Sequence, residues 1–418
     1  MGPIRIIAAA AALVIAQGAR ADDLAALLKA CSAADSQAAV DACTKLINGG
    51  KMQAKYLPAA YLDRALAYKK LGDDAHSSAD LLFAANHGDG TAAYYLANDY
   101  YDGKGVERDP KKALQWYQAA DKKGVKEAAN EVAYQYDHAI GVEQSDAEAF
   151  KWYKRGADEG HSMAQKNLAI FYEHGRGTPK DIAKALQYYK LAAAAGVSGA
   201  DNNLGQLYLN GTDVPKDFVA AAKWFRQGAD AGSREAQTSM GFLYERGEGV
   251  PKDLGEAMKW YRTAADQGFA IAQVNVGVFY EVGSGVAVDK KEAAKWYAKA
   301  AAQGSQDGKT DLADLYVGDK SLAATPADAC HAFADAADLA YRPAMLPLGL
   351  CLETGEGAEK DVGKAFAYLD LAARDDKKIP AADAERDKLA ALLTPEQKTA
   401  AAAFEADFKA KHPDAPAG

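Results

Sequence analysis

Apolar and small residues recur along this chain with a period of 36 residues that begins at Ala92. Within one period they keep a spacing of three and four, as Leu204, Gly205 and Tyr208 do, which places them on one face of a helix. A break rich in glycine follows, and the next apolar run begins after an Asp, Ser or Thr that can cap a helix. Each period therefore predicts a helix, a turn and a second helix.

Eight such periods follow one another without an insertion, and their first residues are Ala92, Ala128, Ala164, Ala200, Ala236, Ala272, Gly308 and Ala344. We number positions by their offset, the count of residues after the first residue of a period. All five tryptophans share offset 24: Trp116, Trp152, Trp224, Trp260 and Trp296. We expect them to pack between helices. Because one helix pair cannot bury its apolar face alone, stacked pairs predict an all-α fold, an α-solenoid.

The best-formed period runs Met240-Gly241-Phe242-Leu243-Tyr244 through Gly247-Glu248-Gly249 to Lys259-Trp260-Tyr261. It resembles the Sel1-like repeats, relatives of the tetratricopeptide repeats, and the resemblance covers residues 92–379. It implies a right-handed superhelix that binds other proteins. The period of residues 308–343 departs from the pattern, because Asp319 and Ser321 replace the turn glycines and tryptophan is absent.

The segments on either side of the repeats have different patterns. Residues 22–91 are expected to form helices similar to a tetratricopeptide motif, on the evidence of Ala60 to Asp73. Residues 380–418 are expected to form a helix from Thr394 to about Lys411 that caps the open end, followed by a short flexible tail.

The first 21 residues have the three parts of a signal peptide. Arg5 supplies a positive charge, Ile6 to Ala16 an apolar stretch, and Ala19-Arg20-Ala21 the small residues of a cleavage site. The stretch is shorter than the roughly 20 residues that span a bilayer. We expect cleavage after Ala21, no integral membrane segment in the mature protein, and a periplasmic or secreted location.

The chain has four cysteines, an even number that suits an oxidising compartment. Cys31 and Cys43 lie near one end, and Cys330 and Cys351 near the other. Among the three possible connectivities, the local bridges 31–43 and 330–351 are favoured, and four buried free thiols are the alternative. No C-x-x-C motif or histidine spacing indicates a metal site.

The net charge and the sequence motifs argue against several classes of function. With 49 Lys and Arg against 58 Asp and Glu, the net charge is −9 and no basic block offers a site for nucleic acid. Gly304 to Thr310 resembles a phosphate-binding loop but is one residue short and joins two predicted helices. The G-x-S-x-G, H-E-x-x-H and S-x-x-K motifs do not occur. We expect no catalytic residues, no metal and no cofactor. His138, His161 and His174 could approach one another, but solvent-facing polar side chains are the favoured interpretation.

The resemblance to tetratricopeptide repeats implies that offsets 2, 3, 6, 9 and 10 line a concave binding groove. The candidate groove residues are Asn130, Tyr134, His138, Asn167, Ile170, His174, Asn203, Gln206, Asn210, Phe242, Arg246 and Asn275. Their amides can hydrogen-bond an extended peptide, and Tyr134, Ile170 and Phe242 offer apolar contact.

The expected function is a periplasmic scaffold or regulator that binds another protein or peptide. Two alternatives stay open. One is a secreted enzyme that binds or hydrolyses β-lactams, a role associated with Sel1-like proteins that carry a cysteine pair in nearly every repeat. The other is a secreted factor directed at a host.

Overall fold

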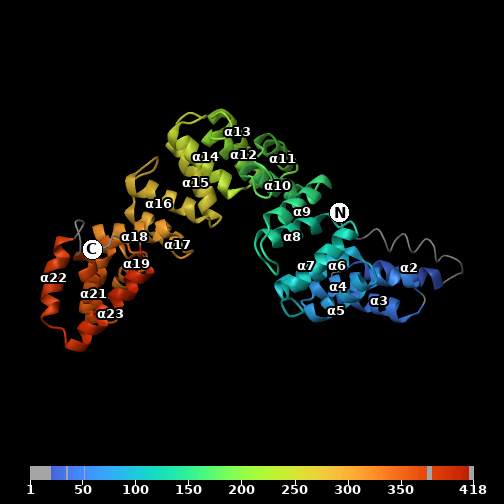
Figure 1. The fold of residues 1–418 in the computed structure, drawn as a ribbon, viewed down its shortest axis with the longest axis horizontal. Helices are drawn as coiled ribbons and strands as arrows, with labels where there is room; N and C mark the ends of the chain where they lie inside the picture. The colour runs from blue at the N-terminus through green and yellow to red at the C-terminus, as the bar shows by residue number, and fades with distance from the viewer. Residues whose placement is uncertain (1–19, 34–35, 51, 374–378, 414–418) are drawn as a thin grey trace. The chain divides into compact units, whose positions relative to one another are not determined.

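The computed structural model describes residues 20–33, 36–50, 52–373 and 379–413. In these ranges every regular element is an α-helix or a short 3-10 turn, and no strand occurs. The predicted all-α solenoid of helix pairs is thereby confirmed (Figure 1). The chain divides into two compact units, residues 1–200 and 201–418.

The first unit starts with two helix pairs that precede the periodic region. They are α2 (Arg20–Cys31), α3 (Gln37–Asn48), α4 (Leu57–Lys70) and α5 (Asp74–Asn86). Three repeats follow, each with a first and a second helix: α6 (Gly90–Asp102) and α7 (Pro110–Lys122), α8 (Lys126–Asp137) and α9 (Asp146–Asp158), α10 (Ser162–His174) and α11 (Ile182–Ala194).

The second unit contains the remaining repeats. Its helix pairs are α12 (Ser198–Asn210) and α13 (Phe218–Asp230), α14 (Arg234–Arg246) and α15 (Leu254–Asp266), α16 (Ala270–Val282) and α17 (Lys290–Ala301), α18 (Gln306–Gly318) and α19 (Pro326–Ala337), α20 (Met345–Thr354) and α21 (Val362–Ala373). The first residues of α12 belong to the first unit.

Helix boundaries follow from capping residues. The carboxylate of Asp253 accepts the backbone N–H of Glu256 at the start of α15 and so satisfies one of the donors that a helix leaves free there. Gly247 ends α14 with a φ of 75°, a left-handed conformation that costs glycine little. The α18 helix ends differently, at Asp319 with a φ of −155° and the short turn η2 (Lys320–Leu322).

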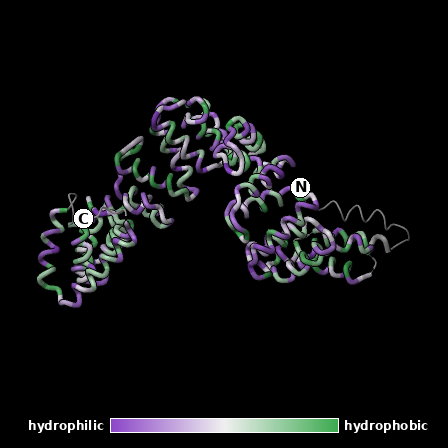
Figure 2. The backbone as a smooth tube through the Cα atoms, viewed as in Figure 1, coloured by the Kyte–Doolittle hydropathy of each residue, from purple (hydrophilic) through white to green (hydrophobic). Residues whose placement is uncertain are grey.

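The core of the repeats is built around offset 25. The residues there are Tyr117, Tyr153, Tyr189, Phe225, Tyr261, Tyr297, Phe333 and Leu369, and all eight are buried. Several of these side chains pack against a small residue at offset 5 of the first helix, as Phe225 does on Gly205. Figure 2 shows hydrophobic and hydrophilic residues alternating along the helices, as a single buried face requires.

The tryptophans at offset 24 are less buried than the sequence led us to expect. Only Trp296 is buried, and the other four are half-buried. Trp260 lies under the guanidinium of Arg226 from the preceding second helix, 5.0 Å from the ring centroid. Successive helical residues point about 100° apart, so when offset 25 faces the core, offset 24 faces the edge of the neighbouring helix pair.

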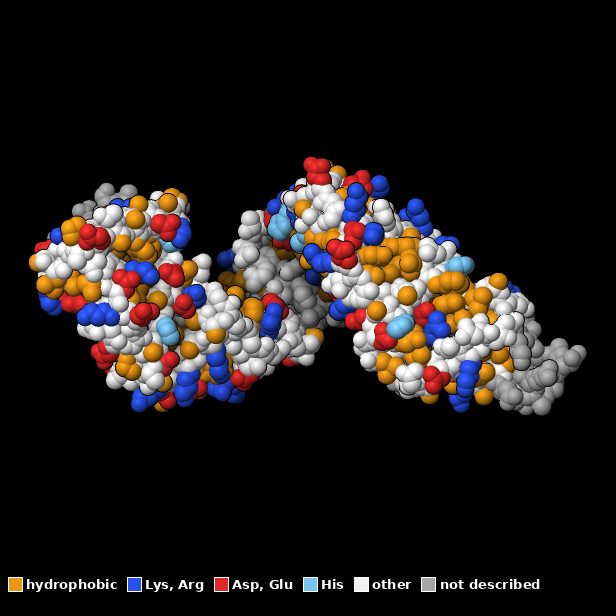
Figure 3. Space-filling view, turned by 90° about the horizontal axis from the view of Figure 1, so that it is seen from below, with side chains coloured by type: hydrophobic (Ala, Val, Ile, Leu, Met, Phe, Trp, Pro, Cys, Tyr) orange, Lys and Arg blue, Asp and Glu red, His pale blue; other side chains and the backbone are white. Residues whose placement is uncertain are grey.

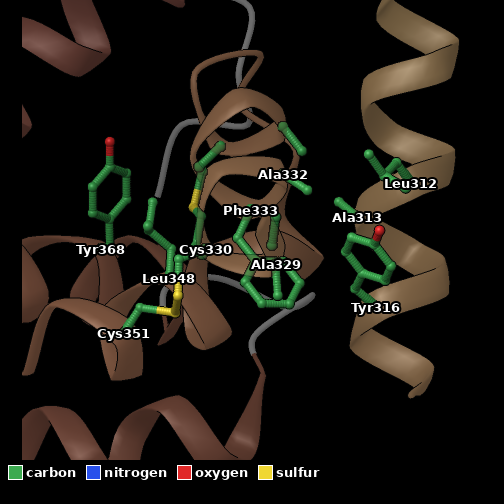
Figure 4. Close-up of a cluster of buried hydrophobic side chains, with 14 of the residues drawn as sticks. Leu312, Ala313, Tyr316, Ala329, Cys330, Ala332, Phe333, Leu348, Cys351 and Tyr368 are labelled. Atoms are coloured by element: carbon green, nitrogen blue, oxygen red, sulfur yellow. A yellow bond between two sulfur atoms is a disulfide. The ribbon is translucent and has the colours of Figure 1, made fainter. Parts of the chain in front are cut away.

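Both favoured cysteine pairs are disulfides in the structure. Cys31–Cys43 joins α2 to α3, and Cys330–Cys351 joins α19 to α20. Figure 4 shows the second bridge beside Phe333, Leu348 and Tyr368 in the core of the second unit.

The C-terminal end has two helices after residue 379 where the sequence led us to expect one, α22 (Pro380–Ala390) and α23 (Pro395–Lys411). Tyr368 on α21 packs against Phe404 and Phe408 of α23, with ring centroids 5.1 and 6.4 Å away. These contacts cover the last repeat with apolar side chains.

The expected signal peptide lies outside the described residues, except for Arg20 and Ala21, which begin α2. Among the helices that are described, none has the length and apolarity needed to cross a membrane.

Candidate functional site

The candidate residues lie on the first helices of five repeats. Eleven of the twelve are within α8, α10, α12, α14 and α16, and His138 directly follows α8. We call the surface formed by offsets 2, 3, 6, 9 and 10 of the first helices the first-helix face. Most candidates are half-buried or exposed there, whereas Asn130 is buried.

Amide side chains connect neighbouring first helices across this face. In the first unit, Asn167 donates from Nδ2 to Oδ1 of Asn130 at 3.1 Å, and Asn130 donates to Glu131 at 3.1 Å. The buried amide of Asn130 thus holds α8 and α10 together. Glu131 was not among the sequence candidates, and burial raises the pKa of its carboxyl group.

The second unit has a similar connection through a hydroxyl group. Gln206 on α12 donates to the hydroxyl of Ser239 on α14 at 3.4 Å. The single proton of that hydroxyl has two acceptors within reach, Asn202 on α12 at 3.4 Å and the carbonyl of Glu235 on its own helix at 3.1 Å. Asn202 and Ser239 share the offsets of Asn130 and Asn167, so the 36-residue period could have identified both. The floor of the face is therefore polar and hydrogen-bonded within the protein.

Offsets 6 and 10 form pairs one helical turn apart, which lie on the same side of a helix. The ring of His138 stacks on Tyr134 with centroids 4.0 Å apart, and Nδ1 of His138 is 3.1 Å from the carbonyl oxygen of Tyr134. The guanidinium of Arg246 lies 4.6 Å from the ring centroid of Phe242, within cation–π range. These pairs present flat, mixed polar and apolar surfaces.

Glutamates at offset 9 of three first helices accept hydrogen bonds from tyrosine hydroxyls of the core. Tyr189, Tyr261 and Tyr297 reach through their repeats and donate to Glu173, Glu245 and Glu281 at 2.6, 2.8 and 2.7 Å. Burial raises the pKa of Tyr261 and Tyr297, and the hydrogen bond to each glutamate adds to the shift. These glutamates therefore fix the first-helix face to the core. The tyrosine period at offset 25 was the signal that could have revealed this link.

Asp137, also at offset 9, belongs to a small charged cluster. Arg176 in the turn after α10 pairs with both Asp137 and Asp146, each at 2.5 Å. Tyr153 donates to Asp137 at 3.4 Å. The two aspartates raise the pKa of Arg176 and join three successive elements of the first unit.

Of the three histidines that the sequence singled out, His174 is the exposed last residue of α10, and the other two have separate local contacts. His138 stacks on Tyr134, and His161 caps α10 by accepting the N–H of Ala164 at Nδ1, 3.3 Å away. Burial lowers the pKa of His161. In the described part of the chain, no group of three His, Cys, Asp or Glu residues has the arrangement of a metal site.

Exposed apolar side chains that were not sequence candidates extend the first-helix face in the second unit. Val278 and Val282 on α16 occupy offsets 6 and 10 with exposed fractions of 38% and 62%, and Val317 on α18 is also exposed. The helices α16 and α18 are in direct contact. Together with Phe242 on α14, these valines form what we call the valine row.

A family model matches seven segments of the chain. The Sel1 repeat model matches residues 90–124, 126–161, 162–197, 198–233, 234–269, 270–305 and 342–377. The interval 306–341, where the turn glycines are replaced, is not matched.

Solved structures agree with this match. The chain is similar to a protective antigen present in uropathogenic Escherichia coli strains that displays an SLR fold, with 28% identity and a TM-score of 0.56 over 90% of this chain and 85% of that one. It is also similar to a Sel1 repeat protein from Oxalobacter formigenes, with 28% identity and a TM-score of 0.55 over 58% of this chain and 99% of that one. Comparison with curated proteins gives no match.

Proposed function

Because the chain belongs to the Sel1 repeat family, we propose that it is a non-catalytic scaffold that binds another protein through its first-helix face. Sel1 repeats generally serve protein–protein interaction. Solenoids use the extended surface that successive repeats create, since each repeat adds the same positions beside those of its neighbour.

The valine row carries this proposal. A soluble helix normally turns branched apolar side chains toward the core, yet Val278, Val282 and Val317 expose theirs on adjacent first helices. The surrounding amides and glutamates are held by internal hydrogen bonds, so the polar part of the face is preorganised. Such a surface suits a partner that brings apolar side chains to several repeats at once.

The proposed partner is an extended segment of another protein. Apolar side chains of the segment would contact the valine row, and its backbone would hydrogen-bond half-buried amides such as Asn203 and Asn275. Figure 3 shows hydrophobic side chains between acidic and basic ones of both signs on the face in view.

We further propose that the protein works outside the cytoplasm. The two disulfides support this location, because such bonds persist in oxidising compartments. Cell fractionation and N-terminal sequencing test it. The expected result is a periplasmic or secreted protein that begins at Asp22, and a cytoplasmic protein with reduced cysteines would contradict it.

The binding face is tested by photocrosslinking in intact cells. A photoreactive amino acid replaces Val282 in one variant and Val219 in a matched control. Val219 is the same residue type, is 69% exposed, and lies on the second helix α13. We expect a defined adduct from position 282 and none of the same mass from position 219.

A charge substitution then measures how much the valine row contributes to partner binding. Val278→Glu with Val282→Glu should weaken capture of the crosslinked partner by at least about tenfold, since buried contacts at the centre of an interface dominate its affinity. Val219→Glu should leave capture unchanged. Equal adducts from both positions, or full capture by the double variant with unchanged helicity, would reject the first-helix face as the binding surface.

A further inference from the structure

The turn between α18 and α19, like the turn between α12 and α13 with Asp213, lacks the second turn glycine on which the packing of the other turns depends. In most repeats the second turn glycine, at offset 13, lies directly on the start of the preceding second helix. A Cβ on Gly249 would stand 2.0 Å from the carbonyl oxygen of Phe218, and one on Gly357 would stand 2.4 Å from that of Pro326. Ser321 occupies this offset after α18 and carries the Cβ that such an approach forbids.

A cavity of about 580 Å³ lies beside this altered turn, between η2, α19 and α20. Its apolar wall consists of Ala329, Phe333, Leu350 and the Cys330–Cys351 disulfide. Figure 4 shows Ala329 and Phe333 on the same helix as Cys330, close to the bridge. The volume falls in the range of roughly 300–1,000 Å³ typical of small-molecule sites. The disulfide fixes two of the cavity walls relative to each other.

Two exposed residues of opposite charge, Lys320 and Glu356, are among those that line the cavity. The ammonium group of Lys320 lies 5.8 Å from the ring centroid of Phe333, and Glu356 borders the cavity from the turn after α20. Neither makes an ion pair with any residue that the structure describes. The hydroxyl of Thr354, which also faces the cavity, already donates to the carbonyl of Leu350 at 2.9 Å.

From this arrangement we propose that the cavity binds a zwitterionic small molecule with an apolar body, of the class of short apolar peptides such as dipeptides. Lys320 pairs with the carboxylate of the ligand and Glu356 with its ammonium group. The apolar body packs against Phe333, Leu350 and the disulfide. A zwitterion can pair with both protein charges at once, whereas a purely anionic or cationic ligand can pair with only one of them. No residue of the valine row lines this cavity, although Leu350 and Thr354 occupy offsets 6 and 10 of the first helix α20 and so belong to the first-helix face.

Calorimetric titration with a panel of apolar dipeptides tests the proposal on the full mature protein. Each dipeptide is compared with its N-acetylated form, which lacks the ammonium group, and its C-amidated form, which lacks the carboxylate. We expect saturable binding of the free dipeptide and about tenfold weaker binding of each blocked form. If no dipeptide of the panel binds, or if blocked and free forms bind equally, the proposal is wrong.

Substitutions of Lys320 and Glu356 test which group of the ligand each residue pairs with. Lys320→Gln should weaken binding of the free dipeptide about tenfold and leave binding of the C-amidated form unchanged. Glu356→Gln should weaken binding of the free dipeptide by the same factor and leave binding of the N-acetylated form unchanged. Lys398→Gln, which removes an exposed lysine on α23, is the control and should change nothing. Ala324→Trp places a large ring at the exposed edge of the cavity and should abolish binding without changing the circular dichroism spectrum. If Lys320→Gln weakens all three forms equally, the assigned pairing is wrong.

Discussion

Gly241 on α14 lies directly against the ring of Tyr261 on α15, so that a Cβ on this glycine would stand 2.6 Å from Cδ1 of the tyrosine. The same tyrosine sends its hydroxyl to Glu245, one helical turn beyond the glycine. One residue pair therefore sets the distance between the two helices of a repeat and also fixes an acidic side chain of the first-helix face.

Gly241→Ala should destabilise the second unit by about 1–3 kcal/mol, because the added methyl group overpacks a closed contact. Thermal unfolding followed by circular dichroism measures the change. The control is Gly199→Ala, where the new methyl group would meet only the Cδ atom of Lys166 at 3.6 Å. This control should be neutral or stabilising by up to about 1 kcal/mol, since alanine favours the helix. Equal destabilisation by both substitutions would mean that the Tyr261 contact is not the cause.

Trp296 is the one buried tryptophan among the five. We therefore expect it to contribute most of the tryptophan emission at short wavelengths. Trp296→Phe should therefore shift the native emission to longer wavelength, while Trp224→Phe should not. Trp296→Ala should cost about 3–5 kcal/mol because it leaves a cavity. Replacing the half-buried Trp224 by Ala should lower the free energy of unfolding by a smaller amount. A larger loss at Trp224 than at Trp296 would contradict the observed burial.

Loss of either disulfide should lower stability by about 2–4 kcal/mol, because each bridge restricts the unfolded chain. The paired substitutions Cys31→Ser with Cys43→Ser and Cys330→Ser with Cys351→Ser test the two bridges separately. Peptide mapping without reduction should recover the 31–43 and 330–351 links from the native protein. A 31–351 link would refute the observed pairing.

Asp63 on α4 should make stability depend on pH in the acidic range. Burial raises the pKa of its carboxyl group to about 6 in the folded protein, despite the hydroxyl of Ser32 that donates to it at 3.2 Å. Because the folded pKa is above the unfolded value, the folded state is penalised increasingly as pH rises through this range. Asp63→Asn should therefore gain on the order of 3 kcal/mol at pH 7.5 and much less near pH 4.

Thermal melting at both pH values measures this effect. Asp41→Asn, at an exposed position on α3, is the control and should show no such difference. A gain of equal size at both pH values would exclude ionisation of Asp63 as its origin.

His161 should make the stability of the start of α10 depend on pH in the opposite direction to Asp63. Burial lowers its folded pKa below the ordinary value of 6.5, and its Nδ1 serves as acceptor for the N–H of Ala164. As pH falls below that value, the unfolded chain gains a proton that the folded state resists, so the local stability declines. Hydrogen exchange of the first amides of α10 should therefore accelerate between pH 7 and pH 5.5 beyond its intrinsic pH dependence.

His161→Asn keeps a capping acceptor without a titratable group and should remove this acceleration. His331→Asn, at an exposed position on α19, should leave it in place. Persistence of the effect in the asparagine variant at position 161 would show that another group is responsible.

The sequence by itself determined the architecture of this protein. A period of 36 residues, with turn glycines and a capping Asp in nearly every repeat, specifies local structure, and local rules suffice for helix pairs that pack mainly on their neighbours. The cysteine pairing followed for the same reason, because residues 12 and 21 apart on consecutive helices can meet without any long-range arrangement.

Tertiary packing alone decided which face each periodic position serves. Offsets 24 and 25 are both aromatic in most repeats, and only the contact of Tyr261 with Gly241 shows that offset 25 is the core position while four tryptophans stay half-buried. The hydroxyl bonds to Glu245 and Glu281 were equally hidden, since they join residues 16 positions apart on two different helices. The cavity beside Ser321 depends on how closely a turn approaches the preceding helix, and that distance is set by packing across repeats, which no single stretch of sequence specifies.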